Sequence, residues 1–115
     1  MSDGKRVLVV DDEPAIRYTV KDVLSEAGYR VATAEHGAQA LVEVSRERPH
    51  VILLDLMMPV MDGWTFLGQV GQDIPVVLMS ATYNLRGSEP RPPVRGILPK
   101  PFDVAELVDL VAALA

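Results

Sequence analysis

Residues 50–55 read HVILLD, four consecutive apolar residues that close on an acid. An apolar run of this length, without polar alternation, is typical of a strand buried on both faces of a parallel sheet. Other strand-like runs lie at 5–10, 30–34, 75–79 and 94–98. Segments of helical period lie between them, so the sequence predicts an α/β fold in which helices cover both faces of a five-stranded parallel sheet.

The predicted helices have recognisable ends. Pro14 suits the first turn of a helix, and Gly28 suits the position just after its end. Between them, apolar residues recur at helical spacing: Ile16, Val20, Val23, Leu24 and Ala27. Three more helices are predicted, over 37–48, from 62 onward and from 103 onward. No regular helix is predicted for 82–93, which contains Gly87 and three prolines.

Length and charge restrict the class of protein. A chain of 115 residues with 49% hydrophobic content is the size of one domain, which we expect to span 1–115. The formal charge of −5 argues against direct binding to nucleic acid or to an anionic membrane, because phosphate contacts need a cationic surface. No apolar run is long enough for a signal peptide core or a membrane span, and we expect a cytoplasmic location. The chain has no cysteine and hence no thiolate metal site.

Acidic residues follow two of the predicted strands. Asp11 and Asp12 come directly after the first strand, and Asp55 closes the third. Ligands of open α/β sheets bind at the carboxyl ends of the strands, where the strand order reverses. If the first and third strands are neighbours there, three carboxylates converge and need a counter-charge. A hard divalent cation meets this need, and Mg²⁺ fits better than Ca²⁺ because few protein oxygens are offered.

Two more strand ends contribute groups of complementary character. Ser80 offers a hydroxyl after the fourth strand, and Lys100 offers an ammonium group after the fifth. Carboxylates, a cation, a hydroxyl and an ammonium group around one cavity form a site for a phosphoryl group. Each residue taken alone also fits a structural role, since the acids of 11–13 suit the start of a helix and a serine suits a turn.

Five motifs give the chain a resemblance to a known family. They are Val-Asp-Asp-Glu-Pro at 10–14, Leu-Leu-Asp-Leu-Met-Met-Pro at 53–59, Met-Asp-Gly at 61–63, Ser-Ala at 80–81 and Lys-Pro-Phe at 100–102. One motif alone is weak, but all five occur in order, each at a strand end. From Lys5 to Ala115 the chain resembles a response-regulator receiver domain of two-component signalling, with the fold of the chemotaxis regulators.

The resemblance implies a phosphoacceptor switch with Mg²⁺ as its cofactor. Asp55 would accept a phosphoryl group from a phosphohistidine, carried by a sensor histidine kinase or by a histidine phosphotransfer protein of a phosphorelay. Asp12 and Asp55 would bind Mg²⁺ directly, together with the backbone carbonyl of Met57, and Asp11 would bind it through water.

The resemblance also implies the sheet order 2-1-3-4-5 and the roles of the remaining groups. Ser80 would bond one oxygen of the phosphoryl group, and Lys100 would pair with another. The Lys100–Pro101 peptide bond is a candidate for the cis form, which costs little before proline. The family is a class of signalling domains rather than enzymes, with only self-catalysed phosphoryl transfer and dephosphorylation expected.

The chain departs from the family pattern on the output side. Receivers usually have an aromatic residue three positions before the lysine, whose inward movement reports phosphorylation, and here this residue is Ile97. The helix that normally follows the fourth strand falls in 83–93, so we expect this fourth helix to be short or irregular. Pro99 requires the last strand to lie at the sheet edge. The hypothesis is that phosphorylation is intact while the readout through 83–97 is atypical.

Two alternative functions remain open at the level of sequence. A pseudo-receiver would bind a partner without phosphorylation, which the irregular 83–93 segment favours and the complete acidic pocket opposes. A magnesium-dependent phosphatase usually has a second acid two residues after its nucleophile, where this chain has Met57. The sequence does not identify the output partner, and the chain is either a stand-alone regulator or a domain of a longer protein. For His36 and His50 we expect surface or structural roles.

Overall fold

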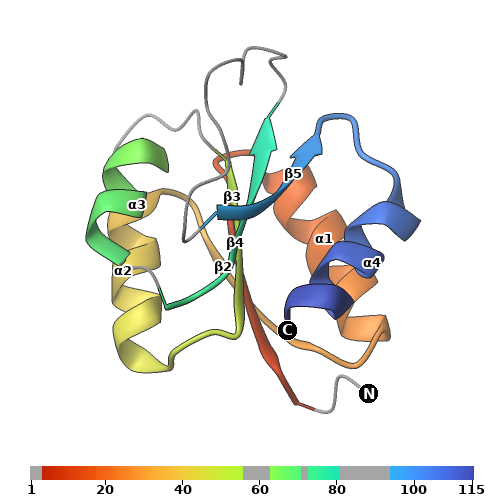
Figure 1. Cartoon of the computed structure of the whole chain (residues 1–115), viewed down its shortest axis with the longest axis horizontal. Coiled ribbons are helices and arrows are strands. Elements are labelled where there is room, and N and C mark those ends of the chain that lie inside the picture. Colours follow the sequence, from red (N-terminus) through yellow and green to blue (C-terminus); the bar gives the residue numbers. More distant parts are fainter. Residues whose placement is uncertain (1–3, 56–62, 71–72, 81–93) are drawn as a thin grey trace.

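Five parallel strands form one sheet in the order β2-β1-β3-β4-β5, as the sequence predicted (Figure 1). The computed structural model describes residues 4–55, 63–70, 73–80 and 94–115. The strands are β1 (Arg6–Val10), β2 (Arg30–Ala34), β3 (Val51–Asp55), β4 (Val76–Ser80) and β5 (Val94–Pro99). β5 lies at one edge, so Pro99, which has no N–H group to donate, ends an edge strand.

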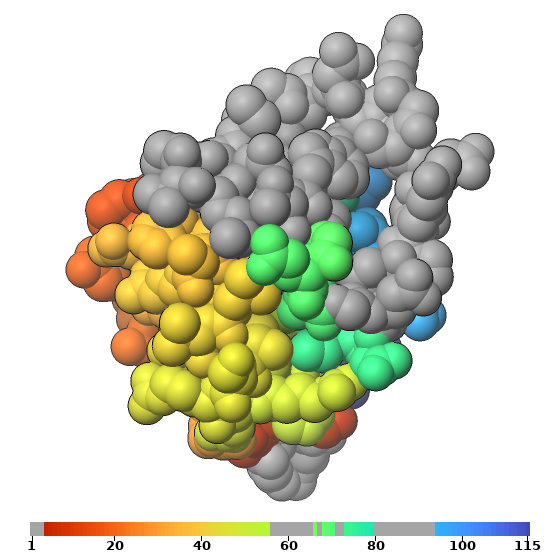
Figure 2. Space-filling view, turned by 90° about the vertical axis from the view of Figure 1, so that its left-hand side faces the viewer, coloured from red at the N-terminus to blue at the C-terminus, as the bar shows by residue number. Residues whose placement is uncertain are grey.

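Helices cover both faces of the sheet. α1 (Pro14–Glu26) and α4 (Val104–Leu114) lie on one side in Figure 1, and α2 (Gly37–Arg46) and α3 (Gly63–Val70) lie on the other. Figure 2 views the face that α2 and α3 form. The expected short or irregular helix in 83–93 lies outside the described residues. No helix in the described part of the chain is long and apolar enough to cross a membrane.

The core consists of two apolar layers, one on each face of the sheet. β1 and β3 are buried along their whole length, which explains why HVILLD lacks polar alternation. Successive residues of a strand point to opposite faces, so Leu8 and Ile52 pack with Phe66 of α3. Val9 and Leu53 pack with the inward residues of α1 and α4. Burial on both faces fixes the register and therefore the place at which each strand ends.

Polar groups close the helix ends. At the end of α1 the N–H groups of Gly28 and Tyr29 bond the carbonyls of Ser25 and Leu24, and Gly28 has a φ of +99°. This is a Schellman arrangement, and it places Gly28 just after the helix end, as predicted. At the start of α2 the Nδ1 atom of His36 accepts a hydrogen bond from the backbone N–H of Gln39 at 3.1 Å. His36 therefore has the structural role expected of it.

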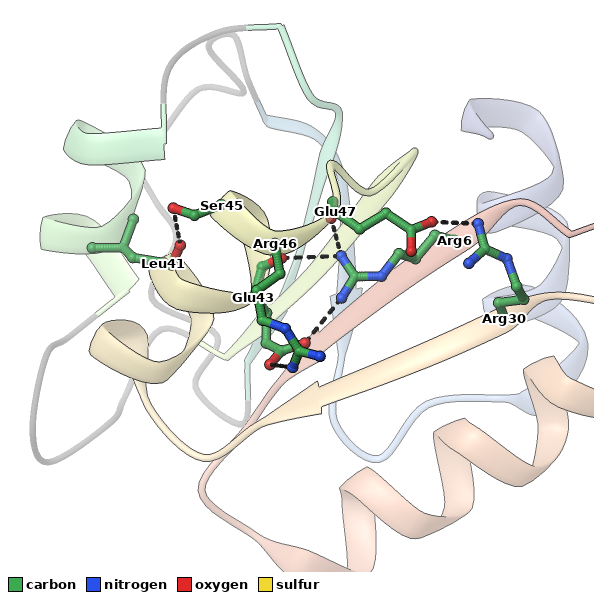
Figure 3. A network of polar contacts seen from close by, with 7 residues as sticks. All are labelled: Arg6, Arg30, Leu41, Glu43, Ser45, Arg46 and Glu47. Carbon is green, nitrogen blue, oxygen red and sulfur yellow. Dashed lines mark hydrogen bonds and ion pairs between the residues drawn. The ribbon is translucent and has the colours of Figure 1, made fainter.

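A buried arginine closes the other end of α2 (Figure 3). Arg6 of β1 donates to the carbonyl oxygens of Glu43 and Glu47, and its Nη2 atom lies 2.9 Å from Oε1 of Glu43. The carbonyl of Glu43 also accepts the backbone N–H of Glu47, whereas the carbonyl of Glu47 lies past the helix end, and α2 ends at Arg46, two residues before the predicted end. The backbone N–H of Arg6 donates to Nδ1 of His50 at 3.1 Å, so the second histidine is also structural.

The fold predicts opposite effects of alanine at two glycines. Gly28→Ala should lower the free energy of unfolding by about 1–2 kcal/mol, because a Cβ atom is strained at positive φ. Gly68→Ala should raise it by about 0.5–1 kcal/mol, because Gly68 lies in α3 and an added Cβ meets no atom within 4 Å. Urea unfolding measures both, and a stabilised Gly28→Ala variant would contradict the assigned cap.

Candidate functional site

Three carboxylates meet at the carboxyl end of the sheet. β1 and β3 are hydrogen-bonded neighbours with Val10 opposite Leu54, so the residues that follow them share one edge. Asp11, Asp12 and Asp55 each place a carboxylate oxygen within 4.8 Å of the others. Asp11 is fully buried and Asp55 is 5% exposed, whereas Asp12 lies at the surface. The cluster predicted from the sequence is therefore formed by the fold.

Backbone hydrogen bonds hold Asp11 on both sides. Its N–H donates to the carbonyl of Ala34 at 3.1 Å, which continues the β1–β2 ladder by one step. Its Oδ1 atom accepts from the N–H of Glu13 at 2.9 Å, an Asx turn that leads into α1. Its second oxygen, Oδ2, accepts from the ammonium group of Lys100 at 2.7 Å. Asp11 thus links the sheet, the first helix and the end of β5.

Lys100 is the cation that the structure places in this cluster. Its Nζ atom lies 2.7 Å from Asp11, 3.5 Å from Glu13 and 3.7 Å from Oδ2 of Asp55, and its side chain is 9% exposed. Lys100 follows β5 directly. The Lys100–Pro101 peptide bond is cis, as expected from the family resemblance. The ammonium group therefore reaches back over the ends of β1 and β3.

Two opposing effects set the pKa of Lys100. Burial disfavours the charged form and by itself would lower the pKa. The hydrogen bond to Asp11, followed by the charges of Asp11, Asp55 and Glu13, outweighs burial, so the pKa of Lys100 is raised above 10.5. Lys100 is therefore a permanent cation at neutral pH.

Among the residues that the structure describes, negative charge exceeds positive charge in this cluster. Lys100 compensates one of the four carboxylates of Asp11, Asp12, Glu13 and Asp55. Two oxygens bound to one Mg²⁺ lie at most about 4.2 Å apart, twice the ~2.1 Å bond. The cluster oxygens all lie within 4.8 Å of one another, close to this limit, so the cluster has the size of a site for one such ion. Oxygen donors and excess negative charge both suit a hard divalent cation.

The other predicted site residues are described only in part. Ser80 ends β4 and lies opposite Pro99 of β5, so its backbone is at the same sheet edge, but its side chain lies outside the described residues. Met57 and its carbonyl group also lie outside them. Sequence reasoning did not single out Arg17, which is 8% exposed and donates to the backbone carbonyl of Asp11 at 2.8 Å. The available signal was an arginine three residues before Val20, on the inward face of the first helix.

Comparisons with known proteins agree on one family. Residues 7–112 match the family model described as the response regulator receiver domain. The chain is 37% identical over 119 residues to the response regulator MprA of Mycobacterium leprae, covering 95% of this chain and 50% of MprA. It is 39% identical over 110 residues to the DNA-binding transcriptional regulator NtrC of Escherichia coli, covering 91% of this chain and 24% of NtrC. The chain thus spans half or less of these two relatives.

Two solved structures with the same fold are covered almost completely by this chain. The chemotaxis response regulator CheY4 of Vibrio cholerae superposes with a TM-score of 0.87 at 31% identity, covering 97% of this chain and 99% of CheY4. The response regulator TrrA of Thermotoga maritima, solved in complex with Mg²⁺-BeF, superposes with a TM-score of 0.87 at 33% identity, covering 96% of this chain and 99% of TrrA.

Removal of the Lys100 charge should destabilise the protein when metal is absent. In EDTA at neutral pH, Lys100→Met should lower the free energy of unfolding by about 3 kcal/mol, because buried carboxylates lose their counter-charge. The folded-state pKa of Lys100 is raised, so its contribution is complete below pH 10.5 and disappears as the pH rises through the folded pKa. Urea unfolding of both proteins across this range should therefore show a difference that shrinks at high pH. A difference that grows with pH would contradict the ion pair.

Proposed function

This chain belongs to the response regulator receiver domain family of two-component signalling, and we propose that Asp55 is its phosphoacceptor. The observation that carries the proposal is the setting of the Asp55 carboxylate. It is buried at the carboxyl end of β3, shares an acidic cluster with Asp11 and Asp12, and lies 3.7 Å from the ammonium group of Lys100. Such a site places a nucleophile beside groups that balance added negative charge.

The donor in the proposed reaction is a phosphohistidine of a sensor histidine kinase or of a histidine phosphotransfer protein. A carboxylate oxygen of Asp55 attacks the phosphorus atom as the P–N bond to the imidazole breaks. The products are an aspartyl phosphate and a neutral imidazole, whose leaving nitrogen takes up a proton. Response regulators receive phosphate from histidine kinases, so this class of kinase is the proposed partner.

The groups around Asp55 have separate tasks in this proposal. Lys100 pairs with a phosphoryl oxygen once Asp55 is modified, exchanging part of its interaction with Asp11 for the new charge. Ser80 donates its hydroxyl to another phosphoryl oxygen from the end of β4. Phosphoryl transfer requires positioning and charge neutralisation more than covalent help, and these two donors provide both.

Mg²⁺ is the proposed cofactor, held by Asp12, Asp55 and the backbone carbonyl of Met57, with Asp11 bound through water. When bound, the ion neutralises charge on the acceptor and on the incoming phosphoryl group. Among the described residues, the excess of carboxylates over ammonium groups and the position of three carboxylate oxygens within 4.8 Å of one another support a divalent cation at this site. We further propose that 1–115 acts as one receiver domain in the cytoplasm, without direct contact to nucleic acid or membrane.

The acidic cluster with its buried lysine favours a phosphorylated switch over a pseudo-receiver. Three carboxylates packed together with a buried lysine cost folding stability that a binding module without chemistry has no reason to retain. A phosphatase is less well supported, because the family is one of signalling domains and a second acid is missing at Met57. Equal affinity for an output partner with and without phosphorylation would favour the pseudo-receiver over the phosphorylated switch.

We also propose that Ile97 makes the readout atypical. Ile97 lies opposite Leu78 in the β4–β5 ladder and packs against the apolar layer on the α2–α3 side of the sheet. It is shorter than the aromatic ring that receivers usually have at this position and has no polar group to bond a hydroxyl. A phosphorylation signal that passes through β5 would therefore use backbone or loop movement in place of the swing of a ring.

The acceptor assignment predicts which substitution abolishes labelling. In the presence of Mg²⁺, a small phosphodonor such as phosphoramidate should add one phosphoryl group to the protein, and Asp55→Asn should remove the labelling completely, because an amide is not a nucleophile. Intact-mass spectrometry measures the product. The matched control is Asp22→Asn on the exposed surface of α1, which should label like the unaltered protein. Labelling of Asp55→Asn at the normal rate would refute the site.

The readout proposal predicts the behaviour of Ile97 on activation. After beryllofluoride and Mg²⁺ are added, amide resonances near Asp55 and Lys100 should shift, while the methyl groups of Ile97 should keep their nuclear Overhauser contacts with Leu78. Ile97 is aliphatic and already packs against the apolar layer, so its side chain would gain no hydrogen bond by moving toward Ser80. Loss of those contacts, or shifts through 83–97 that indicate an ordered helix, would contradict the proposal.

A further inference from the structure

We infer that Arg17 is a positioning residue for the acidic site, acting through the main chain of Asp11. This inference rests on the proposed function. Arg17 would hold Asp11 in the position from which Asp11 bonds Lys100 and contributes to the proposed Mg²⁺ site. Arg17 lies in the second turn of α1 and points inward with Val20 and Leu24. Its contacts are with the carbonyl of Asp11 and the carboxylate of Glu35, so we assign it an effect transmitted through Asp11.

The contacts of Arg17 join three segments around Asp11. Its Nη1 atom donates to the backbone carbonyl of Asp11 at 2.8 Å in a buried hydrogen bond. Its Nη2 atom lies 3.5 Å from Oε1 of Glu35, which follows β2. The planar guanidinium group can make both contacts at once because its donors point in fixed directions. The β1–α1 turn is therefore fixed to α1 and to the β2–α2 turn by a single side chain.

Burial of this guanidinium group is costly unless its donors are used. Arg17 is 8% exposed, and a buried cation requires a partner and hydrogen bonds to offset its desolvation. The partners are one carboxylate and one backbone carbonyl, and the carbonyl belongs to the fully buried residue of the acidic cluster. The buried arginine of α1 thus lies beside the turn that carries Asp11 and Asp12, and it restrains the backbone of that turn.

Asp11 transmits this restraint to the site. Its carbonyl is held by Arg17, its N–H by Ala34 and its Oδ1 by Glu13, which leaves Oδ2 directed at Lys100 at 2.7 Å. Groups behind the metal ligands that fix their orientation commonly change metal affinity about 10–100-fold when removed. Loss of the Arg17 bond should let the turn at Asp11 and Asp12 move, so the preformed oxygen cluster is lost before the ion binds.

Arg6 provides a matched control for Arg17. It is 6% exposed, donates to two backbone carbonyls and pairs with Glu43, so it has the same kind of burial and bonding (Figure 3). Arg6 begins β1, however, and Asp11 follows the other end of that strand. The contacts of Arg6 are with the end of α2, away from the carboxyl ends of the strands. Truncation of either arginine should cost stability, but only one should affect the site.

The test compares Mg²⁺ binding by Arg17→Met and Arg6→Met. Calorimetric titration with Mg²⁺ alone, well below the melting temperature of each variant, should give a dissociation constant at least about tenfold higher for Arg17→Met. Arg6→Met should bind Mg²⁺ like the unaltered protein although its melting temperature falls. The Mg²⁺ concentration that half-saturates labelling by phosphoramidate should rise by the same factor in Arg17→Met.

Each outcome decides the inference. Equal dissociation constants for the two variants would reduce Arg17 to a structural residue and overturn the inference. Tighter Mg²⁺ binding by Arg17→Met would also overturn it, because Arg17 would then act as a positive charge that opposes the ion. Failure of the unaltered protein to bind Mg²⁺ and to label would instead refute the proposed function.

Arg17→Lys keeps the test decisive if Arg17→Met does not fold. A lysine retains the positive charge for Glu35 and most of the apolar stem, but one ammonium group lacks the fixed fork that spans Glu35 and the Asp11 carbonyl. We expect a folded protein whose Mg²⁺ affinity lies between those of the unaltered protein and Arg17→Met. Unaltered affinity in a folded Arg17→Lys variant, with Arg17→Met unfolded, would overturn the inference.

Discussion

Repulsion among the carboxylates at the carboxyl end of the sheet is the constraint on which the site depends. The parallel ladder between β1 and β3 leaves Asp11 and Asp55 no freedom to separate, because both strands are buried on both faces and cannot slip. Lys100 reduces the repulsion through its 2.7 Å bond to Asp11, but the described part of the cluster keeps a net negative charge. A site that is destabilised in this way gains stability from positive charge that enters it, which is why the cluster suits a divalent cation.

The apolar layers and the buried arginines serve this constraint in different ways. The layers on the two faces of the sheet fix the strand register and hence the positions at which the acids emerge. Hydrogen bonds then fix the turns that follow the strands, with Arg17 at the carboxyl end of β1 and Arg6 at its start. Apolar packing restrains the buried strands, but turns lie at the surface and are packed less tightly. Directional hydrogen bonds are therefore needed to hold the turns that carry the acidic residues. Each arginine is buried and donates to backbone carbonyls, one near the start of β1 and the other at its carboxyl end.

Most of the fold and much of the site were accessible from the sequence for identifiable reasons. HVILLD has no polar alternation because β3 lies at the centre of the sheet, and Pro99 marked β5 as an edge strand. The cluster of Asp11, Asp12 and Asp55 followed from the rule that parallel strands end at a common edge. The end of α2 was predicted two residues too late, because Glu47 has an extended backbone and its carbonyl accepts a bond from Arg6, which is distant in sequence.

The sequence by itself determined the order of strands and helices, the residue types at the strand ends and the family to which their motifs point. Local periodicity and motif spacing contain that information, because they depend on residues near one another in the chain. Only the tertiary structure decided that Lys100 lies closer to Asp11 than to Asp55, and that Arg17 holds the carbonyl of Asp11. These contacts depend on how β5 and α1 are placed beside β1. That placement follows from packing between segments that are distant in sequence, and local sequence patterns contain no information about such packing.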